Sequence, residues 1–373
     1  MFPRLAKFPR RIILTCVYMY CLLFIHRLND VHEESKALKV AHLKTIHARA
    51  AQVEAGCASF PPSLTKLQQH ANDAAKVSPN LAAHYTGLHL KAALKNIIYI
   101  KKHNISWCLV PKVASTSWAQ ALLALRGQLG NEYSDPPLQV VLREAFKMID
   151  PTRVNQTINS SLKFLFVRHP FQRLVSAYRN KLEDSYTEQD GSYFYKNYGR
   201  SIVQKFRKSR KKITVATKLT PVGGKNQGDQ NNDNEILDAE NVMKTEEEEE
   251  YVEFKREPSF EEYVDYLINT DVESYDEHWK PIFLQCQVCD FHYDYIIKYE
   301  NFKQEIDTFV EMLQETDRLP RRFILQWENR GGTDEKTTTE YLSQVSQHKV
   351  WLLYQKYRQD FLYFGYTMGN YTK

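Results

Sequence analysis

The sequence predicts an α/β fold with a central parallel sheet, because it contains two successive stretches of strand, loop and helix. In the first, an apolar run at 105–110 ends at Pro111, and apolar residues then recur at helical spacing over 118–126. In the second, an apolar run at 163–167 leads into Arg168-His-Pro, and an apolar helical face begins at Phe171. Since proline suits the first turn of a helix, that helix is expected to begin at Pro170.

The length of 373 residues allows one large domain or two small ones with a sizeable core. A hydrophobic content of 43% is ordinary for a globular protein. The net charge of +5 says little as an average, because basic and acidic runs lie in separate places.

The N-terminus carries a membrane-targeting pattern, in which basic residues precede an uncharged run at 12–25 that His26 and Arg27 close. The run is shorter than the about 20 residues that span a standard bilayer, so it fits a cleaved signal peptide or a short signal anchor. An anchor is favoured, because no small-x-small cleavage site follows and short anchors suit thin early secretory membranes. The basic flank then predicts a cytoplasmic tail at 1–11 and a lumenal body. The alternative is a buried core helix.

Sequons and cysteines favour the lumen. Two of the six cysteines lie in the apolar run, which leaves four for an oxidising compartment. Cys286 and Cys289 have the spacing of a zinc pair, but no second pair lies at finger spacing, so disulfides of unknown pairing are favoured and no metal is expected. Cys57 is free or bridges two chains if it stays outside those pairs. The sequons are Asn104, Asn155, Asn159 and Asn370, and the remaining cysteine is Cys108.

Composition divides the rest of the chain. Residues 26–95 contain no chemical motif and predict a lumenal stem with a helix over 38–53, followed by a catalytic domain at 96–373. Residues 213–250 are rich in Gly, Asn and Asp and end in five glutamates, which predicts a disordered acidic insertion. Later patterns predict a helix over 260–267, a strand over 295–298 and an amphipathic helix over 350–361.

The first loop, at 111–117, has the makings of a phosphate cradle. The N–H groups and dipole at the start of its helix attract an anion, and Lys112 adds a positive charge. Ser115, Thr116 and Ser117 add hydroxyl donors and an N-cap. The spaced glycines of a Walker A loop are absent. The alternative is a capped helix behind a solvated lysine.

The second loop strengthens the case for an anion site. Arg168 ends a strand, and the carboxyl ends of strands in α/β sheets face the crevice where ligands bind. Ser176 lies two turns into the following helix, and Arg173 and Arg179 add charge nearby. The alternative is a set of surface arginines beside a buried serine.

These motifs together resemble those of carbohydrate sulfotransferases. Residues 111–118 resemble the family's 5′-phosphosulfate-binding loop, and residues 166–181 resemble its 3′-phosphate-binding motif. The similarity is to the Golgi chondroitin and dermatan 4-O-sulfotransferases, and it continues at 277–279, 286–289, 293–300 and 357–364. Ser115 stands where many members have cysteine and His169 where many have glutamate, which leaves the subfamily open.

The resemblance implies a P-loop-like, PAPS-dependent sulfotransferase fold in a Golgi type II membrane protein. The implied acceptor is the 4-hydroxyl of N-acetylgalactosamine in chondroitin or dermatan. The alternatives are a sulfotransferase for another glycan and a non-catalytic lumenal glycan-binding protein, whereas a nucleotide kinase would need a Walker A loop and a magnesium-binding carboxylate. The residues expected to bind PAPS are Pro111, Lys112, Val113, Ala114, Ser115, Thr116, Ser117, Arg168, His169, Pro170, Phe171, Gln172, Arg173, Leu174, Val175 and Ser176.

The implied reaction needs a group that stabilises charge and a group that takes a proton. An acceptor hydroxyl attacks sulfur in line, and Lys112 is expected to stabilise the charge that develops on the bridging oxygen. His278, in Glu-His-Trp, is the leading candidate for the general base, and His169 is the second. His278 also fits a structural histidine beside a packed tryptophan.

A basic run at 205–212 suggests a site for a polyanion, here a glycosaminoglycan and not a nucleic acid. A solvated surface helix is the alternative. Aromatic residues just before the run are candidates for stacking on sugar faces or for the core, namely Tyr193, Phe194, Tyr195 and Tyr198.

Overall fold

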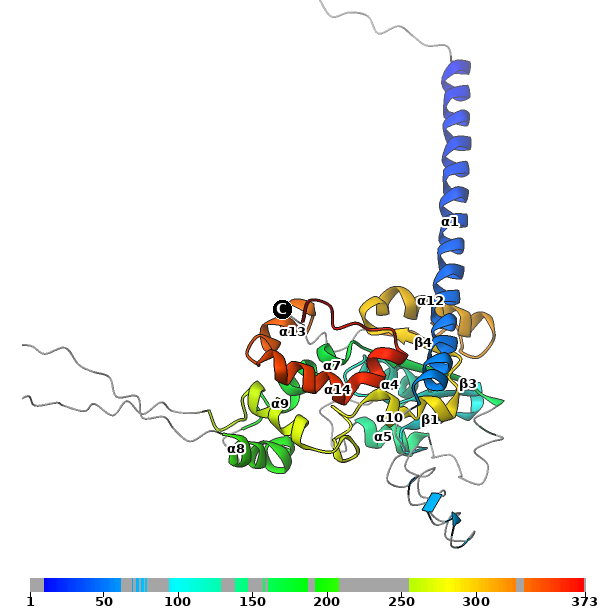
Figure 1. Ribbon diagram of the computed structural model, residues 1–373. Coiled ribbons are helices and arrows are strands. Elements are labelled where there is room, and N and C mark those ends of the chain that lie inside the picture. Colours follow the sequence, from blue (N-terminus) through cyan, green and yellow to red (C-terminus); the bar gives the residue numbers. More distant parts are fainter. Residues whose placement is uncertain are drawn as a thin grey trace, which may run out of the picture.

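The computed structural model describes residues 10–61, 94–128, 138–146, 160–186, 192–207, 255–326 and 332–371, with a few isolated positions besides (Figure 1). The acidic segment 213–250 lies outside these ranges. So do the sequons at Asn155 and Asn159, and the side chain of Asn370 is not described either.

A four-stranded sheet forms the centre of the fold, in the order β1-β2-β3-β4. Its strands are β1 (Ile97–Ile100), β2 (Ile105–Cys108), β3 (Leu162–Val167) and β4 (Tyr295–Lys298). β2, β3 and β4 are parallel, as predicted. The sheet also contains a strand that was not predicted, β1, which pairs antiparallel with β2. Residues 101–104 alone link these two strands, and so short a link permits a hairpin but no crossover.

β2 and β3 are buried almost throughout, which explains why they read as largely apolar runs. Trp118, from helix α4 (Ser115–Leu125), packs edge-on against Phe164 and Phe166 of β3 with ring centroids 5.1 and 5.5 Å apart. Such aromatic contacts add to the burial of apolar area. They hold α4 against β3, and so fix the loop that leads into α4.

A second apolar core lies beside the sheet. Helix α7 (Pro170–Lys181) contributes Phe171, Leu174 and Val175 to it, and α9 (Phe260–Asn269) and α14 (Gln347–Tyr363) pack there too. All the strands and helices predicted in this part of the chain are confirmed, including the start of α7 at Pro170. The other elements are α5 (Leu138–Ala145), a π-helix (Tyr195–Gly199), α8 (Arg200–Phe206), α10 (Ile282–Cys286), α11 (Val288–Phe291), α12 (Phe302–Glu315) and α13 (Glu335–Leu342).

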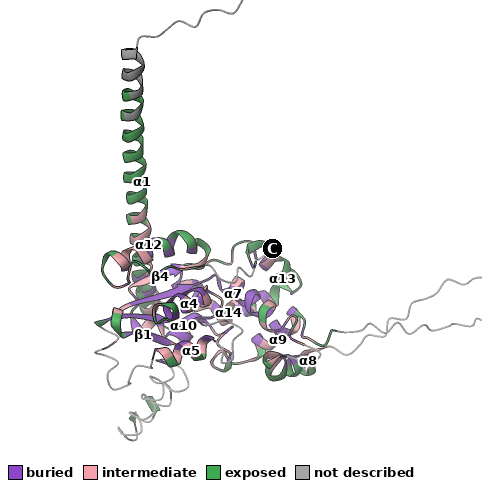
Figure 2. Ribbon diagram, turned by 180° about the vertical axis from the view of Figure 1, so that it is seen from behind, coloured by how far each residue is buried: buried purple, intermediate pink, exposed green. Residues whose placement is uncertain are grey.

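Helix α1 (Arg10–Ser59) has an exposed N-terminal part that projects from the body and a C-terminal part that packs on it (Figures 1 and 2). The helix expected over 38–53 is confirmed inside this longer one. Its packing was not predicted, although Ile46 and Val53 are buried against the sheet core. Arg49 makes a two-pronged ion pair with Glu305 of α12, at 2.6 and 2.8 Å. In the described part of the chain, no helix is long and apolar enough to cross a bilayer.

Side chains of α1 also cover the edge of the sheet. His47 Nδ1 lies 2.9 Å from the carbonyl oxygen of Asp294, and Arg49 donates to the carbonyl of Ile296 at 3.1 Å. These carbonyls belong to β4 or directly precede it, on the side away from β3. Because an open strand edge is a template for aggregation, this cover protects the fold.

Two disulfides, Cys57–Cys289 and Cys108–Cys286, confirm the expectation that these cysteines pair. The first fastens the end of α1 to α11, and the second fastens β2 to α10. Cys57 is therefore neither free nor a bridge to a second chain.

Candidate active site

Three chain segments meet at the carboxyl edge of the parallel strands. In the sheet register, Cys108 pairs with Leu165 and Val167 pairs with Lys298. The residues that follow, Pro111, Arg168 and Tyr299, are therefore brought to the same level. This is the edge at which open α/β sheets bind ligands.

The first loop has a strained backbone. Lys112 and Ala114 have φ angles of 71° and 68°, although neither residue is glycine. Each left-handed residue costs on the order of 1 to 3 kcal/mol and persists only where its surroundings enforce it, as at ligand clamps. The predicted hydroxyl N-cap is wrong, because Ala114 is the N-cap of α4 and Ser115 is already helical. Among the described residues, no side chain caps this end, so the first N–H groups of α4 face the loop.

The other residues of this loop differ in burial. Val113 is fully buried in the sheet core, so only its backbone can face a ligand. Ser115 and Ser117 are buried, whereas Lys112 and Thr116 are half-buried.

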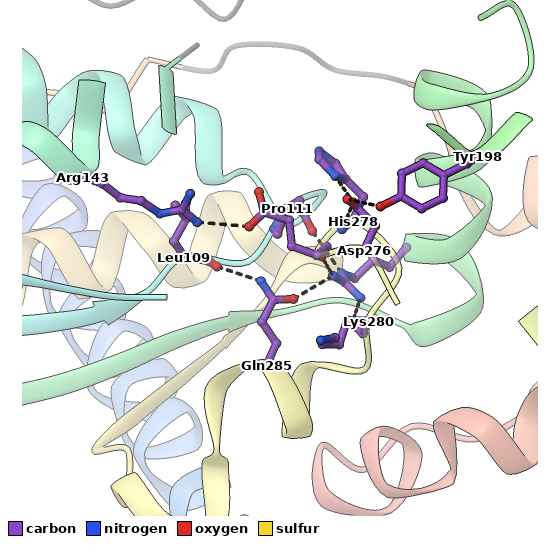
Figure 3. Close-up of polar contacts among 10 residues, drawn as sticks. Leu109, Pro111, Arg143, Tyr198, Asp276, His278, Lys280 and Gln285 are labelled. Carbon is purple, nitrogen blue, oxygen red and sulfur yellow. Dashed lines mark hydrogen bonds and ion pairs between the residues drawn. The ribbon is translucent and has the colours of Figure 1, made fainter. Parts of the chain in front are cut away.

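Arg173 braces this loop through the carbonyl of Pro111, a residue that Figure 3 labels. Its Nε donates to the carbonyl of Pro111 at 3.0 Å, and its two Nη atoms donate to the carbonyls of Lys280 and Glu277 at 2.7 and 2.8 Å. Burial lowers the pKa of the guanidinium, and these carbonyls compensate for the lost water. Arg173 therefore ties the loop to residues 277–280, which is a structural task.

Arg168 is buried differently. Its side chain is 3% exposed, Nη1 donates to the carbonyl of Lys112 at 3.1 Å, and Nη2 donates to the carbonyl of Thr333. The guanidinium lies over the ring of Tyr299, 4.2 Å from its centroid. Within the described ranges, its Nε has no hydrogen-bond partner. Burial lowers the pKa of Arg168, but a guanidinium keeps its charge near neutral pH. A buried cation with an unused donor therefore lies at the sheet edge.

Thr333 is a residue of this site that sequence reasoning missed. Its carbonyl accepts from Arg168, and its hydroxyl accepts from Arg179 Nη1 at 2.9 Å. It lies far along the chain from both arginines and in no recognisable motif, so no sequence signal pointed to it. Ser176, predicted to share the site, is buried on α7 between the two arginines in sequence.

His169 lies in an aromatic cluster. Its backbone N–H donates to Glu300 at 2.7 Å, and Nε2 lies 3.0 Å from the carbonyl oxygen of Thr367. Burial lowers its pKa. This is the environment of a structural histidine, which weakens its candidacy as the base. The surrounding rings are Phe171, Phe361, Tyr366 and Tyr371.

The remaining predicted residues of the second motif serve the core. Pro170, Phe171, Leu174 and Val175 are buried, and only Gln172 is half-exposed. Gln172 donates to the hydroxyl of Tyr371 at 3.4 Å.

His278 is paired with a carboxylate. Its Nδ1 lies 2.6 Å from Oδ1 of Asp276, and Tyr198 donates to Oδ2 of Asp276 at 3.3 Å (Figure 3). Burial lowers the pKa of His278, and the charge of Lys181 lowers it further, against the opposite effect of Asp276. The imidazole is therefore neutral near pH 7, as a general base must be.

Aromatic residues surround this histidine. Phe194 packs edge-on against it with centroids 5.1 Å apart, and Lys181 Nζ lies 4.7 Å from the Phe194 centroid. Tyr193 is 65% exposed next to Phe194, whereas Tyr195 is buried in the core.

Arg207, part of the basic run, forms an ion pair within the fold. Its Nε and Nη2 donate to the two carboxylate oxygens of Glu262 at 2.8 and 2.9 Å, so this arginine serves the fold. Lys205 is exposed, and residues 208–212 lie outside the described ranges.

The described site thus combines a strained loop before a helix, a buried arginine with an unused donor and a histidine–carboxylate pair, groups that can bind an anion and accept a proton. Residues 95–367 match the Sulfotransferase family, and the chain therefore belongs to that family and is a sulfotransferase.

Curated relatives narrow the comparison. The chain is 30% identical over 291 residues to carbohydrate sulfotransferase 11 of Mus musculus, a match that spans 75% of this chain and 69% of the relative. It is 28% identical over 290 residues to carbohydrate sulfotransferase 14 of Danio rerio, across 76% and 66% of the two chains. It is 24% identical over 287 residues to carbohydrate sulfotransferase 9 of Homo sapiens, across 75% and 55%. No solved structure matches the chain.

Proposed function

We propose that this protein transfers a sulfuryl group from PAPS to a glycan hydroxyl, namely the 4-hydroxyl of N-acetylgalactosamine in chondroitin or dermatan. The observation that carries the proposal is the buried Arg168, whose Nε lacks a partner among the described residues. A guanidinium suits the 3′-phosphate of PAPS, because it presents several donors to one anion. Ser176 is the second group proposed for that phosphate, and loop 111–117 is proposed for the 5′-phosphosulfate.

The reaction proposed for this site is a single displacement. The acceptor oxygen bonds to sulfur as the bond from sulfur to the 5′-phosphate oxygen breaks, and PAP leaves. Lys112 and the N–H groups at the start of α4 stabilise the charge that grows on the departing oxygen. His278 takes the proton of the acceptor hydroxyl at Nε2.

The acceptor assignment rests on the relatives and on the surroundings of His278. The relatives are carbohydrate sulfotransferases by name. The exposed Tyr193 offers a ring face for a sugar, and Lys181, next to Phe194, offers a positive charge to an acidic glycan. A sulfotransferase for another glycan is the second candidate, since the relatives are three different carbohydrate sulfotransferases, numbered 11, 14 and 9.

We also propose a Golgi type II arrangement, with a tail at 1–11, an anchor at 12–25, a stem at 26–95 and a lumenal catalytic domain at 96–373. The support is the basic flank before residue 12 and the two disulfides, which persist in oxidising compartments. A reporter protein fused to the C-terminal end of residues 1–27 should reach the Golgi and lie in its lumen. A cytosolic reporter contradicts this arrangement.

An acceptor panel tests the substrate. The protein is incubated with radiolabelled PAPS and desulfated chondroitin, dermatan, heparan and keratan, and the products are digested to disaccharides. Label at the 4-position of N-acetylgalactosamine is expected. Label at another position, or on another glycan alone, overturns the acceptor assignment and leaves the donor assignment in place.

A further inference from the structure

We propose that Asp276 and Tyr198 are positioning residues for His278, which hold its ring with Nδ1 protonated and Nε2 available to the acceptor hydroxyl. The inference rests on the proposed role of His278 as the general base. It adds two residues that neither the motifs nor the relatives assign.

The hydrogen bonds determine which ring nitrogen carries the proton. Asp276 Oδ1 lies 2.6 Å from His278 Nδ1 and accepts the backbone N–H of His278 at 3.0 Å. Because an ionised carboxylate only accepts hydrogen bonds, Nδ1 carries the proton and Nε2 has the lone pair. Burial opposes ionisation of Asp276, but hydrogen bonds from His278 and Tyr198 outweigh it and lower the pKa of this carboxyl.

The turn that carries Asp276 and His278 is fixed on several sides. The carbonyl of Asp276 accepts the N–H groups of Trp279 and Lys280 at 3.1 and 2.8 Å. Trp279 is fully buried, and its carbonyl accepts from Tyr357 at 2.6 Å. Arg173 donates to the carbonyls of Glu277 and Lys280 and also to the carbonyl of Pro111 in loop 111–117, the proposed PAPS-binding loop. The turn that carries His278 and loop 111–117 are therefore tied to one guanidinium.

Tyr198 reaches Asp276 from the π-helix Tyr195–Gly199. The wider turn of a π-helix is often found at functional sites. Here the same short segment brings Tyr198 to Asp276 Oδ2 and packs its ring against Trp279, with centroids 4.9 Å apart. Phe194, which directly precedes the π-helix, packs on the imidazole itself.

The charged groups near His278 determine how readily its imidazole accepts a proton. Lys181 disfavours an imidazolium at this position, whereas Asp276 and Glu277 favour it. Glu277 is engaged by Arg143 at 3.1 Å, so Asp276 is the carboxylate in direct contact with the ring. When His278 takes the hydroxyl proton, Asp276 stabilises the charge that forms.

The competing explanation is that Asp276 only stabilises the turn through the backbone N–H of His278. Asp276→Asn separates the two explanations, because an amide oxygen can still accept that N–H but carries no charge. Tyr198→Phe keeps the ring against Trp279 and removes only the hydroxyl. Asp265→Asn is the matched control, since Asp265 is a carboxylate that pairs with Lys349, at 2.7 Å, instead of with a histidine.

The experiment measures kcat for sulfuryl transfer from pH 5 to 8 together with PAP affinity, for the full chain and these variants. Asp276→Asn should lower kcat by roughly 10²-fold or more with unchanged PAP affinity. The imidazole would no longer be held with Nδ1 protonated, and no carboxylate would stabilise its charged form. The acidic limb of its profile should move to lower pH, because the lost charge favoured the imidazolium. Tyr198→Phe should lower kcat a few-fold and move the limb slightly to higher pH, since Asp276 then attracts the proton more strongly. Asp265→Asn should match the wild type.

Two results overturn the inference. One is an Asp276→Asn enzyme with near-normal kcat and an unmoved acidic limb. The other is a loss of kcat accompanied by an equal loss of PAP affinity in both variants, which indicates a structural role. His278→Ala is measured alongside: if it keeps the full rate, the base assignment and the inference fail together, and if it alone loses the rate, only the inference fails.

Discussion

Arg168 and Arg173 lie five residues apart in the chain and have different tasks. Arg173 directs its donors to three backbone carbonyls, whereas Arg168 has an unused donor at the edge of the sheet. The motif predicted that basic residues gather here, because they follow a strand that ends at the ligand-binding edge. The motif could not show which arginine keeps a donor unused and which one braces the loop. That depends on the carbonyls of Glu277, Lys280 and Thr333, which come from distant segments.

The 3′-phosphate assignment gives the first prediction. Arg168→Ala should weaken PAP binding about 10- to 100-fold, because a charged hydrogen bond contributes about 1.5 to 3 kcal/mol. Ser176→Ala should cost less, and Arg168→Lys should restore only part, since an ammonium lacks the fork of donors. Titration calorimetry with PAP and with its 3′-dephosphorylated form measures both. Equal losses for the two ligands in Arg168→Ala would show that Arg168 supports the fold and does not bind the phosphate.

Asp360 gives a prediction about pH. Burial raises the pKa of its carboxyl to about 6, although the backbone N–H groups of Ile282 and Phe283 donate to it and oppose the shift. The folded state thus binds this proton more tightly than the unfolded state. The resulting stability is fully present below the unfolded pKa of 3.8 and is lost as pH rises through about 6.

Asp360→Asn removes this titration. The difference in the free energy of unfolding between wild type and Asp360→Asn should therefore fall by on the order of 3 kcal/mol from pH 4 to pH 7. Urea unfolding followed by tryptophan fluorescence measures it. A difference that stays constant across this range would mean that Asp360 is ionised throughout.

At the scale of elements, the parallel strands and the helices after them were predictable because their periodicities are local. The antiparallel pairing of β1 and the docking of α1 were not. The docking depends on three contacts with distant partners: the ion pair of Arg49 with Glu305, the cover of β4 by His47, and the disulfide of Cys57 with Cys289. Each partner lies more than two hundred residues away, and no local pattern indicates it. The composition of 26–95 thus suggested a stem, although its helical part also completes the body.

Two ion pairs of α1 form a matched test of this docking. Arg49 and Glu305 are 13% and 5% exposed, whereas Lys39 and Glu311, also at the face between α1 and α12, are 45% and 42% exposed. Arg49→Ala leaves a buried carboxylate without its partner and should cost about 3 to 5 kcal/mol of stability. Lys39→Ala should cost less than about 1 kcal/mol, since water screens that pair. Chemical unfolding of both variants checks this, and equal small losses would contradict the docking.

For the whole molecule, the sheet edge, the Arg173 brace and the turn that carries His278 form one connected site within a disulfide-linked body. The order of motifs along the chain indicated the family, and the match over residues 95–367 confirms it. The proposed anchor precedes this body. A chain that begins at residue 28, secreted with a substitute signal peptide, should therefore keep its activity, and loss of activity with an intact fold would show that the first 27 residues belong to the site.

The most direct test of the central claim is the rate of sulfuryl transfer from radiolabelled PAPS to desulfated chondroitin by wild type and by Lys112→Ala, at saturating donor. Lys112 is proposed to stabilise the departing oxygen of the 5′-phosphate, which gains its charge in the transition state. The variant should therefore lose kcat more than affinity for PAPS. A loss of roughly 10²-fold or more is predicted for removing one such stabiliser. A Lys112→Ala enzyme that transfers sulfate at the wild-type rate would contradict the assignment of loop 111–117 as the site of sulfuryl transfer.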